Sequence, residues 1–380
     1  MKDTVFEWLL QLMKPVDYTS VVMVVKKISV NGLRSYALYS AELHPEVTLI
    51  IGKNGTGKTT LLEAIYFMHR GTSFRGRDRD IIPYESTNAE IKINFDNEEI
   101  RKAQITLQAD GKIAKQFHTD GVKTARLGTK HKLPVVLFEP DELRLLTSSP
   151  GRRRDFLDGI IARLSPTYST VLSRFNRSLA QRNELLKQFD AMKRDVWESH
   201  LFAWDVKLAE LSSTIIKTRI NFIDHSNKQL SRIYSHIAGD EHILSAKYLS
   251  ELSDIKSEGL HQHILGYLES NRQSDAFRGY TSIGPHRDDF TLSLDSHGAA
   301  ETASRGEMRT IMLAFKLLEV ELQEHHSGQK PLILLDDVFS ELDSDRELQL
   351  INSLKNYQTI ITATDLRDYT KEHSSSIITL

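Results

Sequence analysis

Alternating hydrophobic and polar residues mark the first third of the chain as rich in strands. The alternation begins at residues 24–30 and returns at residues 90–95 and 104–108, as expected for strands with one buried face. Residues 47–51 and 134–138 are continuous apolar runs, which are typical of strands buried on both faces. In this part only residues 59–69 have the spacing of a helix. The pattern predicts one half of an α/β nucleotide-binding domain.

The pattern changes to a helical period between about residues 165 and 237. Apolar side chains there step by three, four or small multiples of these: Leu172, Phe175, Leu179, Leu186, Phe189, Leu201, Trp204, Leu208, Leu211, Ile215, Leu230, Ile233 and Ile237. This stripe predicts two long helices that break near residues 198–200 and pack as an arm. Core packing is the favoured interpretation of its leucines and aromatic residues.

Strand patterns return towards the C-terminus, at residues 290–294, 332–335 and 359–362, with a helical pattern at about residues 309–325. We therefore expect an α/β lobe formed by residues 23–145 and 280–380, split by a helical insertion lobe at residues 146–279. Residues 1–22 lack the strand alternation that begins at residue 24, and Met23 directly precedes it. We expect residues 1–22 to be a dispensable N-terminal extension.

Composition excludes several classes of protein. The chain has 380 residues, with 49 Lys and Arg against 51 Asp and Glu, and a formal net charge of −2. Nucleic-acid binding would therefore need local basic patches. The absence of cysteine excludes disulfides, cysteine-ligated metal sites and thiol nucleophiles. No apolar run reaches the ~18 residues of a membrane span and no secretory signal is recognisable, so we expect a cytoplasmic protein without a membrane partner.

A complete phosphate-binding loop follows the apolar run at residues 47–51. Its residues are Gly52, Lys53, Asn54, Gly55, Thr56, Gly57, Lys58 and Thr59, and Thr60 follows in the expected helix. Glycines let backbone N–H groups surround phosphate oxygens at the start of a helix. We expect these residues to bind a nucleotide, with Lys58 reaching the β- and γ-phosphates and Thr59 coordinating Mg²⁺.

Two adjacent acids, Asp336 and Asp337, end the strand expected at residues 332–335. In isolation such acids are common in turns and helix caps, but after a phosphate loop they are typical of the Walker B motif. We expect Asp336 to bind Mg²⁺. Because neighbouring strand residues point to opposite sides, we expect Asp337 to polarise the attacking water.

A weaker signal precedes this strand, where Ser304, Arg305, Gly306 and Glu307 open the expected helix. A serine–glycine turn at a helix start presents N–H donors that suit an anion. An ordinary N-cap is the commoner role of such a serine. Both interpretations stay open on the sequence alone.

In this order along the chain, the motifs resemble those of the ABC-type ATPase heads of the SMC and RecF group. The resemblance implies an α/β fold with a helical, coiled-coil-like insertion. It also implies an ATP-dependent homodimer, in which Ser304 and Gly306 of one subunit contact the γ-phosphate held by the other and Asp343 lies at the seam. Ser304 would then act with Lys58 and Asp337 in catalysis.

Four segments, residues 31–36, 72–75, 149–158 and 284–289, resemble the RecF family in particular. This resemblance covers roughly residues 24–370 and implies a weak ATPase that uses ATP and Mg²⁺ and includes Arg34 in the nucleotide site. It implies binding to double-stranded DNA beside single-strand gaps, at junctions of single and double strand. RecR and RecO are the implied partners, and help in loading recombinase during DNA repair is the implied task.

Three departures from the group's pattern favour slow hydrolysis. Glu307 stands where the signature usually has glutamine, and Thr364 lies near the place of the switch histidine of transporter ATPases. No Gln-loop glutamine occurs between residues 133 and 143, where Glu139, Asp141 or Glu142 could substitute. A DNA-binding or SMC-like structural protein with little ATPase activity is therefore the alternative. A transporter subunit is disfavoured by the long insertion.

Two basic stretches are candidates for contact with nucleic acid. Such stretches are more often solvated faces, but two on one lobe of a balanced chain favour a surface that follows phosphates. The residues expected to contact duplex DNA are Arg75, Arg77, Lys112, Lys115 and Lys123. Residues 152–154, three arginines, could be a third contact or could pair with Asp155 and Asp158. His286 is not expected to bind metal, since no second histidine lies at ligand spacing.

Overall fold

The structure, a computed structural model, describes residues 23–252, 259–365 and 375–380. The extension expected at residues 1–22 lies outside the described residues. The chain divides into two compact units, a helical unit at Arg144–Ile311 and a two-sheet unit formed by residues 23–143 and Met312–Leu380. Across the described ranges, no helix combines the length and apolar character needed to cross a membrane.

An antiparallel sheet of six strands forms one layer of the two-sheet unit, in the order β2-β1-β4-β5-β6-β7. Its strands are β1 (Val25–Leu33), β2 (Tyr36–Glu42), β4 (Asn88–Phe95), β5 (Ile100–Leu107), β6 (Ile113–Thr119) and β7 (Val122–Thr124). Alternate residues such as Ile91, Ile93, Ala103 and Ile105 are buried. The alternation expected at residues 24–30, 90–95 and 104–108 is thereby confirmed.

A parallel sheet of five strands forms a second layer, in the order β14-β3-β13-β12-β8. Its strands are β3 (Val47–Ile51), β8 (Val135–Phe138), β12 (Leu332–Asp336), β13 (Thr359–Ala363) and β14 (Ser376–Thr379). All the residues of β8 and the first four of β12 are buried. This burial explains their continuous apolar sequence, since a parallel strand is covered on both faces.

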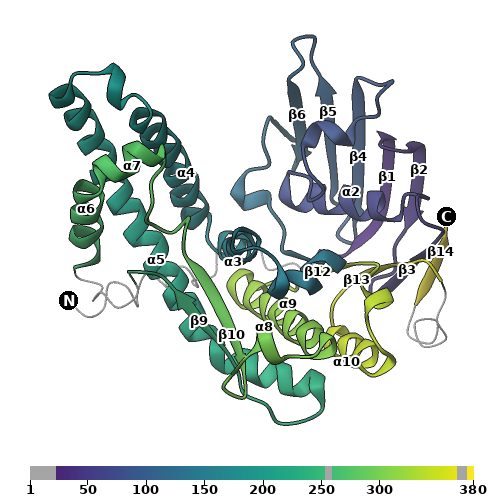
Figure 1. Ribbon diagram of the computed structural model, residues 1–380. Helices are drawn as coiled ribbons and strands as arrows, with labels where there is room; N and C mark the ends of the chain where they lie inside the picture. The colour runs from purple at the N-terminus through teal and green to yellow at the C-terminus, as the bar shows by residue number, and fades with distance from the viewer. Residues whose placement is uncertain (1–22, 253–258, 366–374) are drawn as a thin grey trace. The chain divides into compact units, whose positions relative to one another are not determined.

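Helix α2 (Lys58–Arg70) lies between these two sheets and contacts strands of both (Figure 1). Ten of its 13 residues are buried. Phe67 stacks on Phe117 of the antiparallel sheet, with 5.7 Å between ring centroids. Left-handed glycines cap both ends of the helix, Gly57 before Lys58 and Gly71 after Arg70, because an L side chain rarely adopts this conformation.

Helices α9 (Arg305–Ser327) and α10 (Ser344–Leu354) follow in the C-terminal part of the chain. The chain passes from the helical unit to the two-sheet unit within α9, after Ile311. Further along α9, the side-chain amide of Gln323 accepts from Val135 N at 3.1 Å and donates to Val135 O at 3.2 Å. These bonds attach the buried part of α9 to the edge strand β8.

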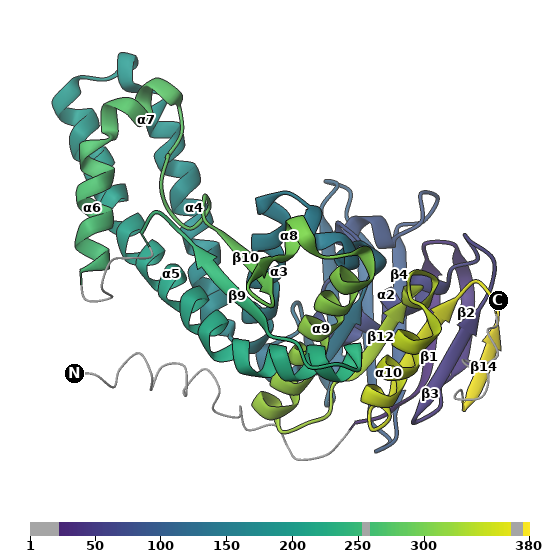
Figure 2. The same ribbon diagram turned by 60° about the horizontal axis from the view of Figure 1, so that its bottom comes forward.

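The helical unit is built around helices α4 (Pro166–Leu186) and α5 (Arg194–Ala238), which run side by side (Figure 2). At 45 residues and about 1.5 Å per residue, α5 is about 68 Å long. The other helices of this unit are α3 (Pro150–Leu164), α6 (Leu260–Ser270), α7 (Arg272–Arg278) and α8 (Ala299–Thr302). Most of the expected apolar stripe is buried, Leu201, Leu208 and Ile215 among it.

The predicted helix break near residues 198–200 is wrong. The chain leaves the helix after Leu186, passes through a short 3₁₀ turn at Phe189–Ala191, and α5 then continues without interruption from Arg194. Residues 198–200 are polar but contain neither glycine nor proline, so nothing in them ends a helix. Glu198 instead accepts from Arg194 at 2.8 Å on the same helix surface, and such a pair supports a helix.

Residues 280–311 belong to the helical unit, whereas the sequence division placed residues 280–380 in the α/β lobe. The strand expected at residues 290–294 is β10 (Asp289–Leu294), which forms a three-stranded antiparallel sheet with β9 (Leu244–Leu249) and β11 (His297–Gly298). The register from Asp289↔Leu249 to Leu294↔Leu244 joins this segment to the arm. The unit that such a strand joins depends on the strand with which it pairs, and the local sequence does not specify that partner.

Candidate nucleotide-binding site

The phosphate loop forms a tight turn between β3 and α2. A Cβ on Gly57 would lie 2.7 Å from the Tyr36 ring, and one on Gly52 would lie 2.6 Å from Thr56 Oγ1. Both distances are too short for a real side chain, so the loop requires glycine at these positions. The Tyr36 hydroxyl also donates to Thr56 O at 3.3 Å, which attaches the loop to β2.

The side chain of Lys58 is enclosed by its own loop. Its ammonium donates to Gly52 O at 2.5 Å and to Lys53 O at 3.1 Å, and the residue is only 7% exposed. Thr60 is the last of the residues predicted to contact the nucleotide, and its backbone N–H donates to Gly57 O at 2.9 Å. The positive charge therefore lies where such loops hold phosphate oxygens.

The predicted magnesium ligands are brought together at the carboxyl ends of the parallel strands. Thr59 Oγ1 donates to Asp336 Oδ1 at 2.9 Å. Thr362, which lies on β13 between β3 and β12, donates its hydroxyl to the same oxygen at 2.8 Å. One carboxylate oxygen is thus held by hydroxyl groups from two directions.

This donor set fits Mg²⁺ bound together with a nucleotide. Hydroxyl and carboxylate oxygens are hard ligands, and Mg²⁺ usually takes one or two protein oxygens and completes its shell with phosphates and water. Within the described residues, no group of three or more His, Cys, Asp or Glu could hold a metal ion by itself.

Asp337 leaves the strand in a left-handed conformation, with φ +52° and ψ +25°. This conformation is uncommon for residues other than glycine, although asparagine and aspartate adopt it more readily than most, and it costs about 1 kcal/mol or more. Hydrogen bonds hold it in place, because Asp337 N donates to Thr362 Oγ1 at 3.0 Å and Ser340 Oγ donates to Asp337 O at 2.7 Å. Backbone strain of this kind is often found at functional sites.

Glu139 follows β8, which is the neighbour of β12, and the pKa of its carboxyl group is strongly perturbed. Burial raises its pKa to about 7, and the negative charges of Glu142 and Asp336 add to the rise. Lys316 opposes the rise and lies 3.2 Å from Glu142. The segment that lacks a Gln-loop glutamine therefore contributes a carboxyl group that titrates near neutrality.

Arg34 is joined to α2 instead of lying free in solvent. Its Nε and Nη2 donate to the Glu63 carboxylate at 2.5 and 2.7 Å, and Glu63 also accepts from Ser73 Oγ at 2.5 Å. The segments at residues 31–36 and 72–75 thus both donate hydrogen bonds to the buried Glu63 carboxylate. A contact between Arg34 and a nucleotide remains a prediction.

Ser304 caps the start of α9 in the helical unit. Its hydroxyl accepts from Glu307 N at 3.2 Å, and the Glu307 carboxylate accepts from Ser304 N at 2.7 Å. This reciprocal pair is a capping box, so the ordinary interpretation of the serine is present in the structure. Ser304 is exposed and Gly306 half-buried, and their predicted contact with a partner's nucleotide remains a prediction.

The predicted DNA-binding residues differ in their surroundings. Arg75, Arg77 and Lys123 are exposed, and Lys112 is exposed beside Asp110, at 2.9 Å. Lys115 is largely buried and donates to Asp78 at 2.6 Å and to Gly71 O at 2.9 Å. Lys115 is thus engaged in an internal ion pair, which leaves the other four as the accessible cations of this set.

Two of the three arginines at residues 152–154 have partners other than Asp155 and Asp158. Arg153 donates to Asp289, with Nε 2.9 Å from Oδ1, and Arg154 donates to Asp288 O at 2.7 Å. Asp158 instead accepts from Arg219 at 2.8 Å. The ring of His286, for which no metal was expected, donates to Thr281 O at 3.0 Å, and burial lowers its pKa to about 4.

Sequence reasoning missed two residues of the site, Thr362 and Lys316. Thr362 is the last residue of the apolar run at residues 359–362, and a hydroxyl at the carboxyl end of a parallel strand was the available signal. Lys316 lies within the apolar part of α9 and is 2% exposed. A buried lysine in an apolar helix indicates an acidic partner, but its position beside Glu142 depends on the fold.

A parallel sheet that carries a phosphate loop and a terminal acid, in a chain with a helical insertion, defines a nucleotide-binding head of the ABC type. The family model for the RecF/RecN/SMC N terminal domain matches residues 24–379. The DNA replication and repair protein RecF of Clostridium perfringens is 33% identical over 351 residues, covering 92% of this chain and 95% of that protein. RecF of Clostridium novyi is 32% identical over 92% of this chain and 96% of that protein.

Solved structures agree with these matches. The recombination mediator protein RecF of the RecFOR pathway, solved as RecF-ATP, aligns with a TM-score of 0.79 and 28% identity over 91% of this chain and 93% of that one. An SMC head bound to the C-terminal winged-helix domain of ScpA aligns with a TM-score of 0.50 at 17% identity, over 94% of each chain, which supports the fold alone. The chain belongs to the RecF family within the RecF/RecN/SMC group, and the predicted fold class is confirmed.

Proposed function

We propose that this protein binds duplex DNA in an ATP-dependent manner during recombinational DNA repair in the cytoplasm. The observation that carries the proposal is the contact of Thr59 with Asp336 at 2.9 Å beside the phosphate loop, in a chain of the RecF family. A relative solved as RecF-ATP supports ATP as the nucleotide. RecR and RecO are the proposed partners, and junctions at single-strand gaps, where recombinase is loaded, are the proposed sites of action.

The proposed nucleotide contacts follow from the loop. Backbone N–H groups of residues 52–60 surround the phosphates, and Lys58 donates to the β- and γ-phosphates. Thr59 and Asp336 hold Mg²⁺, which supplies charge neutralisation when it is bound. Thr362 positions Asp336 by donating to its Oδ1 at 2.8 Å.

Hydrolysis in this proposal depends on Asp337. The Asp337 carboxylate orients and polarises the attacking water. The left-handed backbone of Asp337, which is held by the hydrogen bond to Thr362, sets the direction of this side chain. Glu139 occupies the segment where related ATPases supply a glutamine, and its raised pKa leaves it partly protonated at neutral pH.

Dimer formation provides the switch. Ser304 and Gly306 of one copy contact the γ-phosphate held by the other only when two copies are closed together. A ligand shifts an equilibrium only by its differential affinity for the two states. ATP therefore favours the closed dimer, and ADP, which lacks the γ-phosphate, does not.

The proposal is tested by the fluorescence anisotropy of a labelled duplex, titrated with protein in ATP, in ADP and without nucleotide at fixed salt and Mg²⁺. We expect at least about tenfold tighter binding in ATP, a difference of about 1.4 kcal/mol. Ser304→Arg should abolish this difference, because its side chain blocks the seam. Ser270→Arg, on the exposed end of α6, is the matched control. Equal binding in all three nucleotide states would refute the proposal.

A second candidate is a nucleotide-gated DNA-binding protein, or an SMC-like structural protein, with little ATPase activity. Glu307, which stands where the family signature usually has glutamine and whose carboxylate accepts from Ser304 N at 2.7 Å, favours it. Phosphate release measured over hours separates the two functions. ATP-dependent DNA binding without phosphate release would select the second candidate.

A further inference from the structure

Asparagine is followed directly by glycine at two places in the chain, at Asn31-Gly32 and at Asn54-Gly55. Asparagine is a chemically labile residue, and glycine after it has no side chain to hinder attack of the glycine backbone nitrogen on the asparagine side-chain amide. The attack requires the backbone at the pair to rotate, which glycine permits more readily than any other residue. The fold places the two pairs in opposite surroundings.

The pair Asn31-Gly32 lies inside the antiparallel sheet. Asn31 is on β1 and pairs with Leu38 of β2 on one side and with Glu90 of β4 on the other. Neighbouring backbone is close, since a Cβ on Gly32 would lie 2.8 Å from Asn88 O. Rotation of this segment requires paired strands to separate, and paired strands of a core sheet open much more rarely than a surface loop.

The pair Asn54-Gly55 lies in the phosphate loop between β3 and α2 (Figure 1). Both residues are exposed, and a Cβ on Gly55 would meet nothing within 4 Å. Among the residues that the structure describes, neither the Asn54 side-chain amide nor the Gly55 N–H forms a hydrogen bond. Both reacting groups are therefore accessible.

The turn around this pair is closed through a single carbonyl group. Lys53 O accepts from Thr56 N at 3.3 Å, from Thr56 Oγ1 at 2.9 Å and from Lys58 Nζ at 3.1 Å. These bonds lie beside the pair, and none of them restrains the Asn54 side chain. Gly55 has φ +85°, a region that glycine enters and leaves readily. Local rotation can therefore bring Gly55 N to the side-chain amide.

We propose that Asn54 is a site of deamidation and that nucleotide bound to the phosphate loop protects it. The Gly55 nitrogen attacks Asn54 Cγ, so that a C–N bond forms and the Cγ–Nδ2 bond breaks. The Gly55 N–H gives its proton to water, and the departing nitrogen takes up a proton and leaves as ammonia. The cyclic imide that remains adds one water molecule and opens to aspartate or to isoaspartate.

The protection rests on the proposed nucleotide-binding function. Backbone N–H groups that hold phosphate oxygens fix the backbone of the loop, so the Gly55 nitrogen can no longer approach the side chain. The products act in the opposite direction. Aspartate at residue 54 adds a negative charge beside the phosphates, and isoaspartate also lengthens the main chain of the loop by one carbon atom. Deamidation should therefore lower nucleotide affinity with time, chiefly in protein that carries no nucleotide.

The test incubates the full chain at mildly alkaline pH, with and without a non-hydrolysable ATP analogue and Mg²⁺. Mass spectrometry of peptides follows the conversion of Asn54 and of Asn31 separately. Without the analogue, we expect Asn54 to convert at least about tenfold faster than Asn31, because the loop opens more often than the sheet. The analogue at about ten times its Kd should slow the conversion of Asn54 about tenfold, because it leaves about a tenth of the protein unliganded.

Two variants that replace asparagine with glutamine, which cyclises far more slowly, form a matched pair. In Asn54→Gln, nucleotide affinity should not decrease during incubation, when each protein is compared with its own starting value. In Asn31→Gln, it should decrease as in the original protein. Asn54→Asp has the charge of one product and should bind nucleotide at least about tenfold more weakly from the start. Circular dichroism spectra should show that all three variants are folded.

Two outcomes would overturn the inference. Asn54 could convert no faster than Asn31, or it could convert equally fast with and without the analogue at concentrations that saturate the loop in a direct titration. Failure of the proposed function has a different signature. Fresh protein would then not bind the analogue at all, whereas Asn54 would still convert faster than Asn31.

Discussion

Lys58 is the residue whose surroundings most directly match a role in phosphate binding. Its ammonium already donates to two carbonyl oxygens of its own loop and is 7% exposed. A buried charge with these partners is stable without a ligand and needs little reorganisation to meet one. The residue therefore contributes positive charge from a fixed position.

Replacing Lys58 with alanine should abolish nucleotide binding. The variant loses the cation that contacts the β- and γ-phosphates, and we expect a loss of at least about 100-fold in affinity, because a charged hydrogen bond and its partners are removed together. Titration with a fluorescent ATP analogue measures the change. Lys26→Ala, which changes an exposed lysine on β1 outside the loop, is the control. Near-unchanged affinity in Lys58→Ala would place the phosphates elsewhere.

Replacing Asp337 with asparagine should separate binding from turnover. We expect nucleotide affinity within about threefold of the original but a decrease in single-turnover hydrolysis of about 100-fold or more, the usual contribution of a positioned base. Phosphate release is the measurement. Asp345→Asn, an exposed acid in the first turn of α10, should hydrolyse normally. Rapid hydrolysis by Asp337→Asn would contradict its assignment.

Glu139 should make stability depend on pH in a particular direction. Burial raises its folded-state pKa from 4.5 to about 7, so the folded state holds a proton that the unfolded state releases. Stability is therefore lost as pH rises from about 4.5 to about 7. Glu139→Gln should remove this loss, and the variant should gain stability relative to the original as pH rises. Urea unfolding at several pH values tests this, and a constant difference would exclude the raised pKa.

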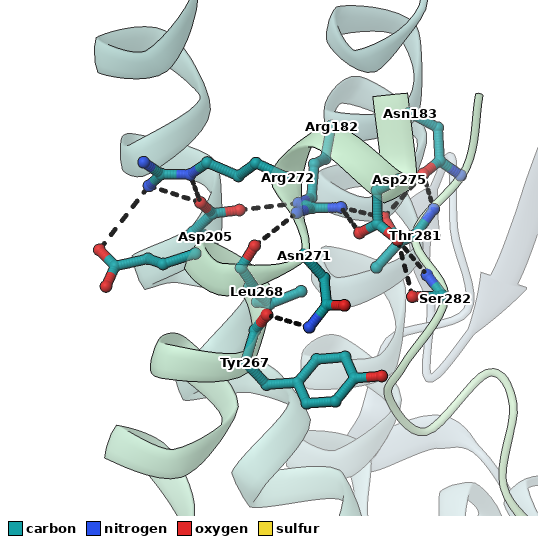
Figure 3. A network of polar contacts seen from close by, with 11 residues as sticks. Arg182, Asn183, Asp205, Tyr267, Leu268, Asn271, Arg272, Asp275, Thr281 and Ser282 are labelled. Carbon is teal, nitrogen blue, oxygen red and sulfur yellow. Dashed lines mark hydrogen bonds and ion pairs between the residues drawn. The ribbon is translucent and has the colours of Figure 1, made fainter. Parts of the chain in front are cut away.

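At the scale of elements, α4 and α5 are joined by buried charge. Arg182, Asp205 and Asp275 are fully buried, and Arg272 brings the second positive charge. The four charges balance. Thr281 Oγ1 also accepts from Arg182, and Ser282 Oγ donates to Asp275 (Figure 3). Such a network fixes which surfaces of the helices meet, even where its net contribution to stability is small.

Removing Arg182 should therefore destabilise the helical unit strongly. Arg182→Met leaves Asp275 without its cation in a buried site, at a cost of about 3–5 kcal/mol. Hydrogen exchange of the amides in α4 and α7 reports this locally, which avoids treating a chain of two units as one folding transition. Arg194→Met, which breaks an exposed pair on α5, should cost at most about 0.5 kcal/mol. Equal effects of the two variants would show that the network is dispensable.

At the scale of the whole molecule, DNA affinity should depend on a few accessible cations, because the net charge is only −2. We expect a variant with Arg75, Lys112 and Lys123 all changed to glutamine to bind duplex with a weaker salt dependence. The slope of log K against log salt should decrease in magnitude by about 0.9 for each phosphate that the variant no longer neutralises. Lys115→Gln should affect stability more than the slope, since its ammonium is paired with Asp78. An unchanged slope in the triple variant would remove this surface from the DNA interface.

Much of the fold and half of the site could be predicted from local sequence. The phosphate loop, the strand before it and the acids at the end of β12 are each contiguous in the sequence, and their chemistry is set by residue order. The apolar runs of β3, β8, β12 and β13 are long enough to be identified as buried strands. The predicted roles of Lys58, Thr59 and Asp336 follow from this order, and the structure places Thr59 Oγ1 2.9 Å from Asp336 Oδ1.

Other features depended on contacts between distant segments. Thr362 contacts Asp336 from the neighbouring strand. Lys115 pairs with Asp78, which lies 37 residues away in the sequence, and Arg182 pairs with Asp275, which lies 93 residues away. The assignment of residues 280–311 to the helical unit depends on the pairing of β10 with β9.

By itself, the sequence determined the class of this protein, because a phosphate loop and an acidic strand end are encoded in adjacent residues and local periodicity. Only the tertiary structure decided which charges are paired inside and which remain accessible. A side chain's partner depends on what the fold places within a few ångströms of it, and composition does not contain this information. Lys115 illustrates the difference, since its place in a basic stretch made it a candidate for DNA contact, whereas the fold pairs its ammonium with Asp78 at 2.6 Å.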